Sequence, residues 1–475
     1  MTSFEVGKLP ISLNDVVTFA RTREVSVSLT PEVQTRLRDN STAASRSALA
    51  TKLYGRNTGV GANRDVVADD SDGQHGRRLL RSHAAGHGPV LSDDVGRAVL
   101  IIRANQLAMG RSGITPDVVS AIVEAIGHNL TPVVRTHGGL GTGDITVLAE
   151  LGLSLLGERA WSGGETRAFL STIDASGALP LMSSSAPTLA VTALAVADVR
   201  SWVDAMFVVC ALSARAVRAN PETWSEVGAS SRNHSGMIEA GRRLRQFVGQ
   251  PLEAPRRLQD PLSWRCLPAV NGALLDSLEQ AEENLTIDVN ASAENPLYAD
   301  DLSWHHGGFH HVGLALALDQ LRLALFQVAS LSLARLTKIH DPAMTGLRPF
   351  LAEGPAGSSG TMVLEYTAAS ALGELRQLAQ PASLSQTVIS LGLEDHASFA
   401  WQSALATRSM LSALRTILAC ELVAAVRAVR RMGAPPEEHP IAVLLSKCIS
   451  LPEVSDDHVL IDDLSAAEAL LDKIC

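Results

Sequence analysis

The segment LAVTALAVADVRSWVDAMFVVCALSARAV, residues 189–217, is the part of the chain that most resembles a membrane span. Its apolar residues recur three and four positions apart, which is the period of an α-helix. Charged residues interrupt it well before about 18 apolar residues accumulate, the length that a membrane helix needs. The segment therefore predicts a long core helix and argues against a membrane partner. The interrupting residues are Asp198, Arg200, Asp204 and Arg215.

The same helical period continues on both sides of this segment and predicts further long helices. Hydrophobic residues make up 46% of the chain and aromatic residues only 4%, so small aliphatic side chains must fill the interior. Closely spaced antiparallel helices pack such side chains well. We predict a mainly α protein built on a long antiparallel helical bundle. The periodic segments are residues 94–110, 116–128, 144–156, 310–338, 361–380 and 400–431.

A small α+β part is expected near the N-terminus. Val25, Val27 and Leu29 alternate with polar residues, as in a half-exposed strand, and Thr30-Pro31-Glu32 is typical of a helix start. Pro435-Pro436 separates a helical tail from the preceding bundle. We predict an N-terminal part over residues 1–190, a central long-helix bundle over 191–432 and a C-terminal helical tail over 433–475.

Charge and cysteine content limit the partners and the compartment. The net charge of −10 argues against a nucleic-acid partner, which needs clustered Lys and Arg. No basic region followed by an apolar run opens the chain, so we expect no secretory signal and a cytoplasmic protein. The 5 cysteines are odd in number and widely spaced, which favours reduced thiols. They are Cys210, Cys266, Cys420, Cys448 and Cys475.

Gly- and Pro-rich breaks between the helical segments carry recognisable motifs, and functional residues tend to lie on such loops. In chain order the motifs are YGRNTGVG (54–61), SHAAGHG (82–88), RANQLAMGRSG (103–113), THGGLGTGD (136–144), QDPLSWRC (259–266), ENPL (294–297), GGFH (307–310), PAS (381–383) and EDH (394–396).

Taken together, the motifs resemble those of the aromatic amino acid lyase family, typified by histidine and phenylalanine ammonia-lyases. The resemblance runs from about residue 11 to beyond residue 430. It implies a long helical bundle of the fumarase and aspartase type. It also implies a homotetramer in which each active site draws loops from several subunits and takes a small-molecule substrate.

One motif departs from the family at its reactive residue. In the family an Ala-Ser-Gly tripeptide cyclises to the electrophile MIO, whereas the matching residues here are Gly141, Thr142 and Gly143, and no serine lies within residues 136–153. We therefore expect neither MIO nor another cofactor. A dehydrated threonine would carry an extra methyl group that shields the carbon to be attacked. Alternatively, the loop is a turn before a helix, with Asp144 or Thr142 as its N-cap; without Gly-Lys-Ser/Thr, a phosphate cradle is disfavoured.

The resemblance also implies roles for retained side chains. Tyr54 matches a tyrosine that transfers protons, and Arg265 matches the arginine that binds the substrate carboxylate through paired donors. Phe309 matches an aromatic residue beside the reactive ring, and Glu394 a carboxylate that meets the substrate. His83 lies where the family has a site histidine, which titrates near neutral pH. Each of these residues has a structural alternative as a packing, capping or ion-pairing residue.

Other positions of the predicted site have changed. Ser185, Leu262 and Gly308 replace an asparagine, a tyrosine and an asparagine of the family pattern. Histidines are gained nearby, and they predict a new acid–base set, with His87 or His310 working against Glu394. No recognised ligand spacing supports a metal site. The gained histidines are His87, His137, His305, His306, His310 and His311. We predict Tyr54, His83, Glu394 and Thr142 as catalytic residues and Arg265, Phe309, His87, His310, Gly141 and Leu262 as substrate-binding residues.

These changes remove groups that an ordinary ammonia-lyase needs. We therefore predict a MIO-independent enzyme that performs acid–base elimination, addition, cyclisation or isomerisation on an amino-acid-derived or other carboxylate substrate. A role in specialised metabolism is expected by analogy. The alternatives are an ammonia-lyase or aminomutase with an electrophile made from Thr142, and a non-catalytic homologue that binds a metabolite or stabilises an assembly.

Overall fold

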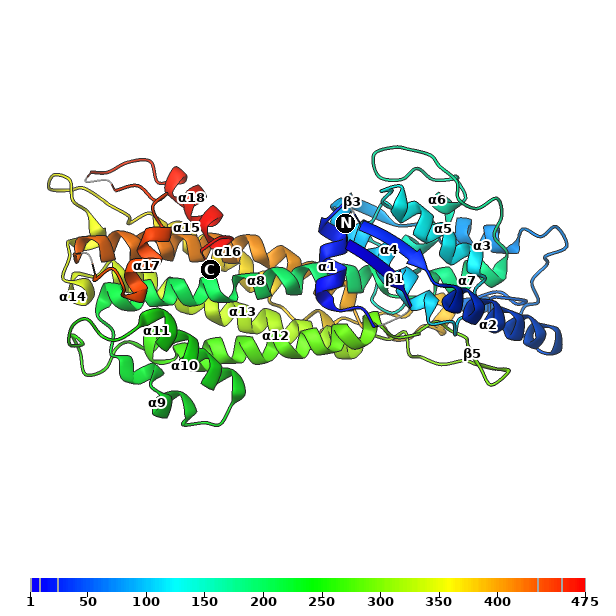
Figure 1. Cartoon of the computed structure of the whole chain (residues 1–475), viewed down its shortest axis with the longest axis horizontal. Coiled ribbons are helices and arrows are strands. Elements are labelled where there is room, and N and C mark those ends of the chain that lie inside the picture. The colour runs from blue at the N-terminus through cyan, green and yellow to red at the C-terminus, as the bar shows by residue number, and fades with distance from the viewer. Residues whose placement is uncertain (1, 8–9, 24, 434, 454–455, 475) are drawn as a thin grey trace. The chain divides into compact units, whose positions relative to one another are not determined.

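The computed structural model describes residues 2–7, 10–23, 25–433, 435–453 and 456–474 (Figure 1). The chain forms two compact units, each assembled from separate parts of the sequence. Unit 1 contains Met1–Ala197, Ala281–Leu318 and Pro381–Arg408, and unit 2 contains Asp198–Gln280, Asp319–Gln380 and Ser409–Cys475.

Long helices are the dominant elements, as predicted from the helical period (Figure 1). In α8, Pro187 lies in the first turn, where its missing N–H breaks no helical hydrogen bond. By length and composition α13 and α16 could each cross a membrane, but 61% and 78% of their most apolar windows are buried in the protein. Such burial is typical of core helices. The long helices are α8 (Ala186–Val217), α12 (Leu267–Val289), α13 (Val312–Ile339) and α16 (Ala400–Arg431).

Unit 1 contains short strands beside its helices. The predicted strand is present as β2 (Val25–Leu29), which pairs in parallel with β1 (Thr2–Val6). The antiparallel pairs β3 (His87–Val90) with β4 (Arg135–His137), and β5 (Leu297–Ala299) with β6 (Leu302–Trp304), were not predicted. They are too short for apolar and polar residues to establish an alternating pattern.

Most of the motifs lie in unit 1, together with its shorter helices. In α4 (Asp93–Ala108) every residue from Val95 to Ala108 is buried, including Arg103, Asn105 and Gln106. The other helical elements are α1 (Leu13–Arg21), α2 (Pro31–Ala50), η1 (Gly61–Asn63), α3 (His75–His83), α5 (Pro116–Gly127), α6 (Ile145–Leu155), α7 (Ala175–Met182), η4 (Ala382–Leu384) and η5 (Ser390–Gly392).

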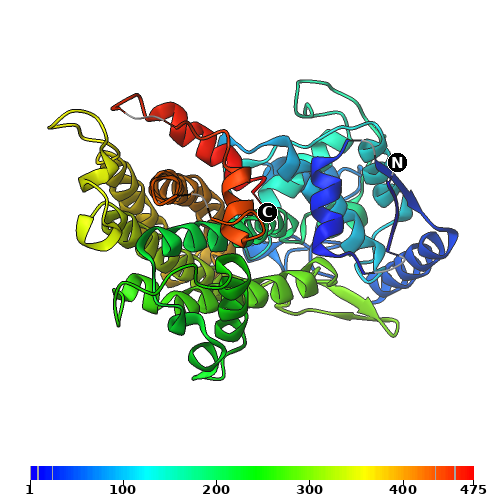
Figure 2. The same cartoon turned by 60° about the vertical axis from the view of Figure 1, so that its left-hand side comes forward.

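Unit 2 contains the remaining helices, and α17 and α18 fall within the predicted tail. Figures 1 and 2 show α18 beside α16, where Arg415 donates to the backbone oxygen of Glu468 at 2.7 Å. The helical elements are η2 (Pro221–Trp224), α9 (Glu226–Ser230), α10 (Ser235–Val248), α11 (Leu262–Arg265), α14 (Pro342–Thr345), η3 (Pro349–Leu351), α15 (Leu364–Leu378), α17 (Pro440–Lys447) and α18 (Ile461–Leu471).

Candidate functional site

The Gly-Thr-Gly loop connects β4 to α6 and is held in a tight conformation. Gly141 has a φ of +69°, which favours glycine. A Cβ atom on Gly141 would lie 2.6 Å from the Cβ atom of Ala400 and 2.7 Å from its backbone nitrogen. The loop therefore packs directly against the start of α16, and the absence of a side chain at position 141 permits this approach.

Asp144 holds the loop in place through hydrogen bonds. It occupies the predicted N-cap position of α6, but its side chain does not cap that helix. One carboxylate oxygen accepts from the backbone nitrogen of Gly141 at 2.9 Å, and the other accepts from the backbone nitrogen and hydroxyl of Thr188 at 3.1 and 2.6 Å. Burial raises the pKa of Asp144, although these hydrogen bonds favour its charged form. Asp144 thus joins the loop to the first turn of α8.

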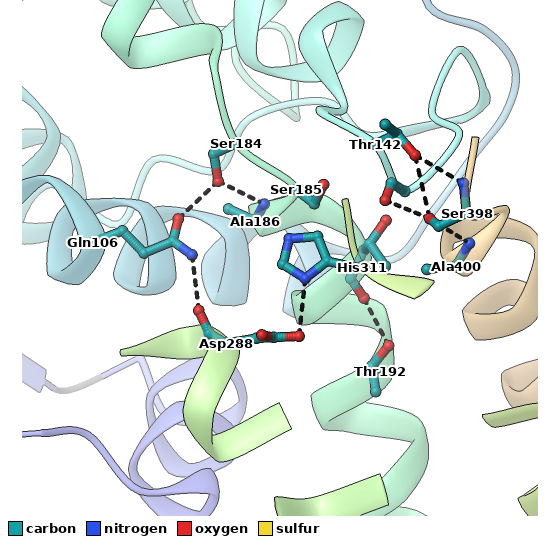
Figure 3. A network of polar contacts seen from close by, with 12 residues as sticks. Gln106, Thr142, Ser184, Ser185, Ala186, Thr192, Asp288, His311, Ser398 and Ala400 are labelled. Carbon is teal, nitrogen blue, oxygen red and sulfur yellow. Dashed lines mark hydrogen bonds and ion pairs between the residues drawn. The ribbon is translucent and has the colours of Figure 1, made fainter. Parts of the chain in front are cut away.

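Thr142 belongs to a polar network in which Ser398 is its partner (Figure 3). Its hydroxyl accepts from the backbone nitrogen of Ser398 at 2.8 Å and contacts the Ser398 hydroxyl at 3.3 Å. The Ser398 hydroxyl in turn donates to the carbonyl oxygen of Gly141 at 2.5 Å. On the other side of the loop, the backbone nitrogen of Gly143 donates to the Ser185 hydroxyl at 3.0 Å. Both glycines that flank Thr142 are therefore hydrogen-bonded.

A histidine pair lies next to this network. Thr142 and His310 form an antiparallel β-bridge, and Nε2 of His310 lies 2.9 Å from Nδ1 of His396. Between two imidazoles one nitrogen must donate and the other accept, so the contact holds one shared proton. Burial lowers the pKa of His310, and the neighbouring His396 lowers it further. His310 therefore remains a neutral proton acceptor at neutral pH.

Acidification is expected to destabilise this part of the protein. The folded state disfavours the protonated form of His310. The stability that neutral His310 contributes is therefore present above the ordinary pKa of 6.5, and it is lost as the pH falls through the lowered pKa of the folded state. Thermal unfolding of the wild type should therefore depend more steeply on pH than that of His310→Gln, between about pH 5 and 7. Equal pH slopes for the two proteins would contradict this assignment.

Tyr54 and Glu394 are brought together by two other loops of unit 1. The Tyr54 hydroxyl accepts from the backbone nitrogen of Gly61 at 2.8 Å, and the Ser390 hydroxyl accepts from that of Ala62 at 3.0 Å. Burial raises the pKa of Tyr54, and the Glu394 carboxylate raises it further. Tyr54 is therefore a protonated phenol at neutral pH.

Other predicted residues of unit 1 have different surroundings. His83 ends α3, and its Nδ1 lies 2.8 Å from the carbonyl oxygen of Leu79, which leaves only Nε2 for a substrate. His87 is exposed in β3, opposite His137. Phe309 is half-buried beside His310. His306 is tied to the backbone of Glu294 and Gly308, at 2.7 and 2.9 Å.

Arg265 and Leu262 belong to unit 2, where they end and begin the short helix α11. The Nε atom of Arg265 donates to the carbonyl oxygen of Asp260 at 2.8 Å, and one terminal nitrogen donates to the Gln259 side chain at 3.2 Å. These bonds orient an otherwise exposed guanidinium. The Leu262 residue is 59% exposed.

Some residues of the site were not predicted from the sequence. Ser398 contacts Thr142 across 256 positions of the chain, and no sequence pattern indicates that contact. The same holds for Asp288, which binds His311 at 2.9 Å. His396 lies within the EDH motif, but only the fold places it against His310. The sequence shows Ser185 as a substitution, but only the fold shows that its hydroxyl accepts from the backbone nitrogen of Gly143.

Metal-binding groups and thiols give no further candidate site among the described residues. Within the part of the chain that the structure describes, no group of three or more His, Cys, Asp or Glu residues is arranged to hold a metal ion. Cys210, Cys420 and Cys448 are buried free thiols. Burial raises the pKa of the first two to about 12 and that of Cys448 to about 11, so these thiols stay protonated. Cys266 is free and half-buried, and Cys475 lies outside the described residues.

The long helices and the Gly-rich loop together fit the helical lyase scaffold that the motifs predict. The aromatic amino acid lyase family model matches residues 11–448, and the chain belongs to this family. It is 33% identical to the histidine ammonia-lyase of Symbiobacterium thermophilum over 496 residues, covering 99% of this chain and 97% of that protein.

Solved structures agree with this assignment. The ergothioneine-degrading enzyme ergothionase of Treponema denticola has a TM-score of 0.92 at 25% identity, covering 99% of each chain. The tyrosine aminomutase of Streptomyces globisporus has a TM-score of 0.91 at 24% identity, covering 100% of this chain and 97% of the other, and shares its fold. The predicted family, helical fold and lyase-like enzyme class are thus confirmed.

Proposed function

We propose that the protein is a MIO-independent enzyme that moves protons on a small carboxylate substrate derived from an amino acid. The reaction is an elimination or addition, a cyclisation or an isomerisation, in specialised metabolism. We further propose a cytoplasmic homotetramer with active sites shared between subunits. The observation that supports the proposal is the hydrogen bond between Thr142 and Ser398, next to the His310–His396 pair.

The Gly-Thr-Gly loop does not fit the family's MIO group. Ring closure requires the Gly143 nitrogen to attack the Gly141 carbonyl carbon. In the folded loop that nitrogen donates to Ser185, and the Gly141 carbonyl oxygen accepts from Ser398. The methyl group of Thr142 would also remain on the carbon that must be attacked. These features support a linear loop whose threonine hydroxyl takes part in hydrogen bonding.

The retained side chains supply acid–base groups in place of an electrophile. His310 is held neutral beside His396 and can accept a proton, while protonated Tyr54 can donate one. Glu394 lies beside Tyr54 and presents an exposed carboxylate to a substrate amine or ring. Arg265 is the group we propose for binding the substrate carboxylate, because its planar guanidinium pairs with two oxygens.

The masses of the intact protein and of the tryptic peptide spanning residues 136–159 test the linear loop. We expect both masses to be those of the unmodified sequence. The peptide spanning residues 160–167 from the same digest calibrates the measurement. A deficit of two waters localised to Gly141, Thr142 and Gly143 would overturn the proposal.

Activity is tested by changing the acid–base and carboxylate-binding groups separately. On a substrate found by screening carboxylate-bearing amino-acid derivatives, Tyr54→Phe should lower kcat by roughly 10²–10⁴-fold, because the proton donor is lost. Arg265→Lys should chiefly raise KM, because paired donors to the carboxylate are lost. A protein that binds such molecules but shows no turnover that depends on Tyr54 would be a non-catalytic homologue.

An ammonia-lyase or aminomutase with an electrophile derived from Thr142 is the second candidate. It is favoured by the 33% identity with a histidine ammonia-lyase over almost the whole chain. This candidate requires the mass deficit that the first candidate excludes. Ammonia release from histidine or a related amino acid, together with that deficit, would establish it.

A further inference from the structure

A second histidine lies on the buried side of the Gly-Thr-Gly loop. His311 is 5% exposed, and its Nδ1 lies 2.9 Å from a carboxylate oxygen of Asp288. Its Nε2 is fully buried and has no hydrogen-bond partner among the described residues. Figure 3 shows this ring beneath Ser185, with its bonded nitrogen directed to Asp288. Burying an imidazole nitrogen without a partner costs free energy.

The bond to Asp288 fixes both the orientation and the tautomer of the ring. A carboxylate only accepts, so Nδ1 of His311 must carry the proton. Asp288 is itself anchored, because the Gln106 side chain donates to its carbonyl oxygen at 3.2 Å. Gln106 also accepts from the Ser184 hydroxyl at 2.7 Å, next to the start of α8. The imidazole is therefore held by a network that extends through α4 and α12.

The backbone of the same residue contacts the loop. The backbone nitrogen of His311 lies 3.4 Å from the carbonyl oxygen of Gly141, at the weak end of the hydrogen-bond range. This contact continues the β-bridge between Thr142 and His310. The side chain of His311 thus anchors the segment that presents His310 to His396.

We propose that the Asp288–His311 pair is a positioning device, which holds the Gly-Thr-Gly loop against His310 and keeps the His310–His396 pair in register. His311 is a positioning residue and does not touch the substrate. The catalytic consequence rests on the proposed acid–base function, whereas the structural one is independent of any reaction. The loop is already bonded to Asp144, Ser185 and Ser398. The weaker contact from the His311 backbone adds to these bonds only while the segment that carries His311 is itself held in place.

Two matched variants separate the effect of the His311–Asp288 hydrogen bond from the effect of the ring volume. In His311→Asn the amide nitrogen has the reach of Nδ1 and can still donate to Asp288. In His311→Phe a ring remains, but the donor is lost and the half-buried carboxylate of Asp288 loses its partner. Each protein is studied by hydrogen exchange of peptides covering residues 136–145, and by the rate at which diethyl pyrocarbonate modifies His310.

In His311→Phe, exchange of the loop amides and modification of His310 should both be faster, by about tenfold or more. His311→Asn should restore both rates to near those of the wild type. Peptides around His340 in unit 2 serve as a control and should not change. Unchanged loop exchange in His311→Phe, failure of the asparagine variant to restore it, or equal acceleration in the control peptides would each overturn the proposal.

These outcomes are distinct from a failure of the proposed function. Hydrogen exchange and histidine modification need no substrate, so the positioning role can hold even if the loop peptide shows a loss of water. Conversely, an unmodified loop with the same exchange in both variants would leave the proposed reaction intact and remove only the role of His311.

Discussion

Replacing Glu421 by alanine is expected to lower the free energy of unfolding by about 3–5 kcal/mol, because it leaves a buried guanidinium without its counter-charge. Glu421 is 0% exposed in α16 and binds Arg335 of α13 through both oxygens, at 2.6 and 2.8 Å. The hydroxyls of Ser213 and Ser332 donate to the same carboxylate, each at 2.5 Å. One side chain therefore joins α8, α13 and α16 within unit 2.

Urea unfolding of wild type, Glu421→Ala and the double variant Arg335→Met with Glu421→Leu measures this effect. The double variant should recover most of the loss, since apolar residues of similar volume commonly replace a buried ion pair without a large penalty. If Glu421→Ala costs less than about 1 kcal/mol, in the range of an exposed ion pair, the described burial is wrong.

Replacing Gly141 by alanine is expected to cost about 2–5 kcal/mol, the sum of a left-handed backbone at a non-glycine residue and a steric overlap. The added Cβ atom would meet the backbone nitrogen of Ala400 at 2.7 Å and the hydroxyl oxygen of Ser398 at 2.8 Å. The backbone of α16 cannot move aside as a flexible side chain does. Denaturant unfolding and the hydrogen exchange of residues 136–145 measure the loss.

Thr142→Ser is the matched control, because it removes only a methyl group and keeps the hydroxyl that accepts from Ser398. It should change the stability by less than about 1.5 kcal/mol. The double variant Gly141→Ala with Thr142→Ser restores the family's Ala-Ser-Gly tripeptide. We expect its loop peptide to have the unmodified mass, because the loop cannot accept the alanine. A double variant as stable as the wild type that has lost two waters would show that the site still supports cyclisation.

The long helices could be predicted because local sequence carries their signal. In α8 the apolar period persists from Ala186 to Val217, long enough to outweigh its scattered charges. The strands β3 to β6 could not be predicted, since segments as short as Arg135–His137 contain no measurable alternation. Their pairing depends on which chain segments the fold places next to them. For example, His87 of β3 pairs with His137 of β4.

Some features of the candidate site could likewise be predicted from the sequence, and others could not. The motif order placed Tyr54 and Glu394 in one site, and the structure brings their loops together. His310 has His396 as its hydrogen-bond partner, which the motifs did not indicate, and its predicted acid–base work against Glu394 stays a prediction. Of the two predicted N-cap residues, Asp144 and Thr142, Asp144 occupies that position, but its side chain binds Gly141 and Thr188 and does not cap the helix. Both differences arise because side-chain partners depend on packing across the chain.

The sequence by itself determined the helical architecture, the family and the chemical groups available near the loop. Periodicity and motif order are local properties, so they can be read without a fold. Only the tertiary structure decided which groups meet, since Thr142 and Ser398 are 256 positions apart and His311 and Asp288 are 23 apart. It also decided which side chain is buried: His310 lies beside the loop with a partner imidazole, whereas the next residue, His311, is buried against a carboxylate. Burial and a fixed partner set the charge and orientation of an imidazole, and both are properties of the folded chain.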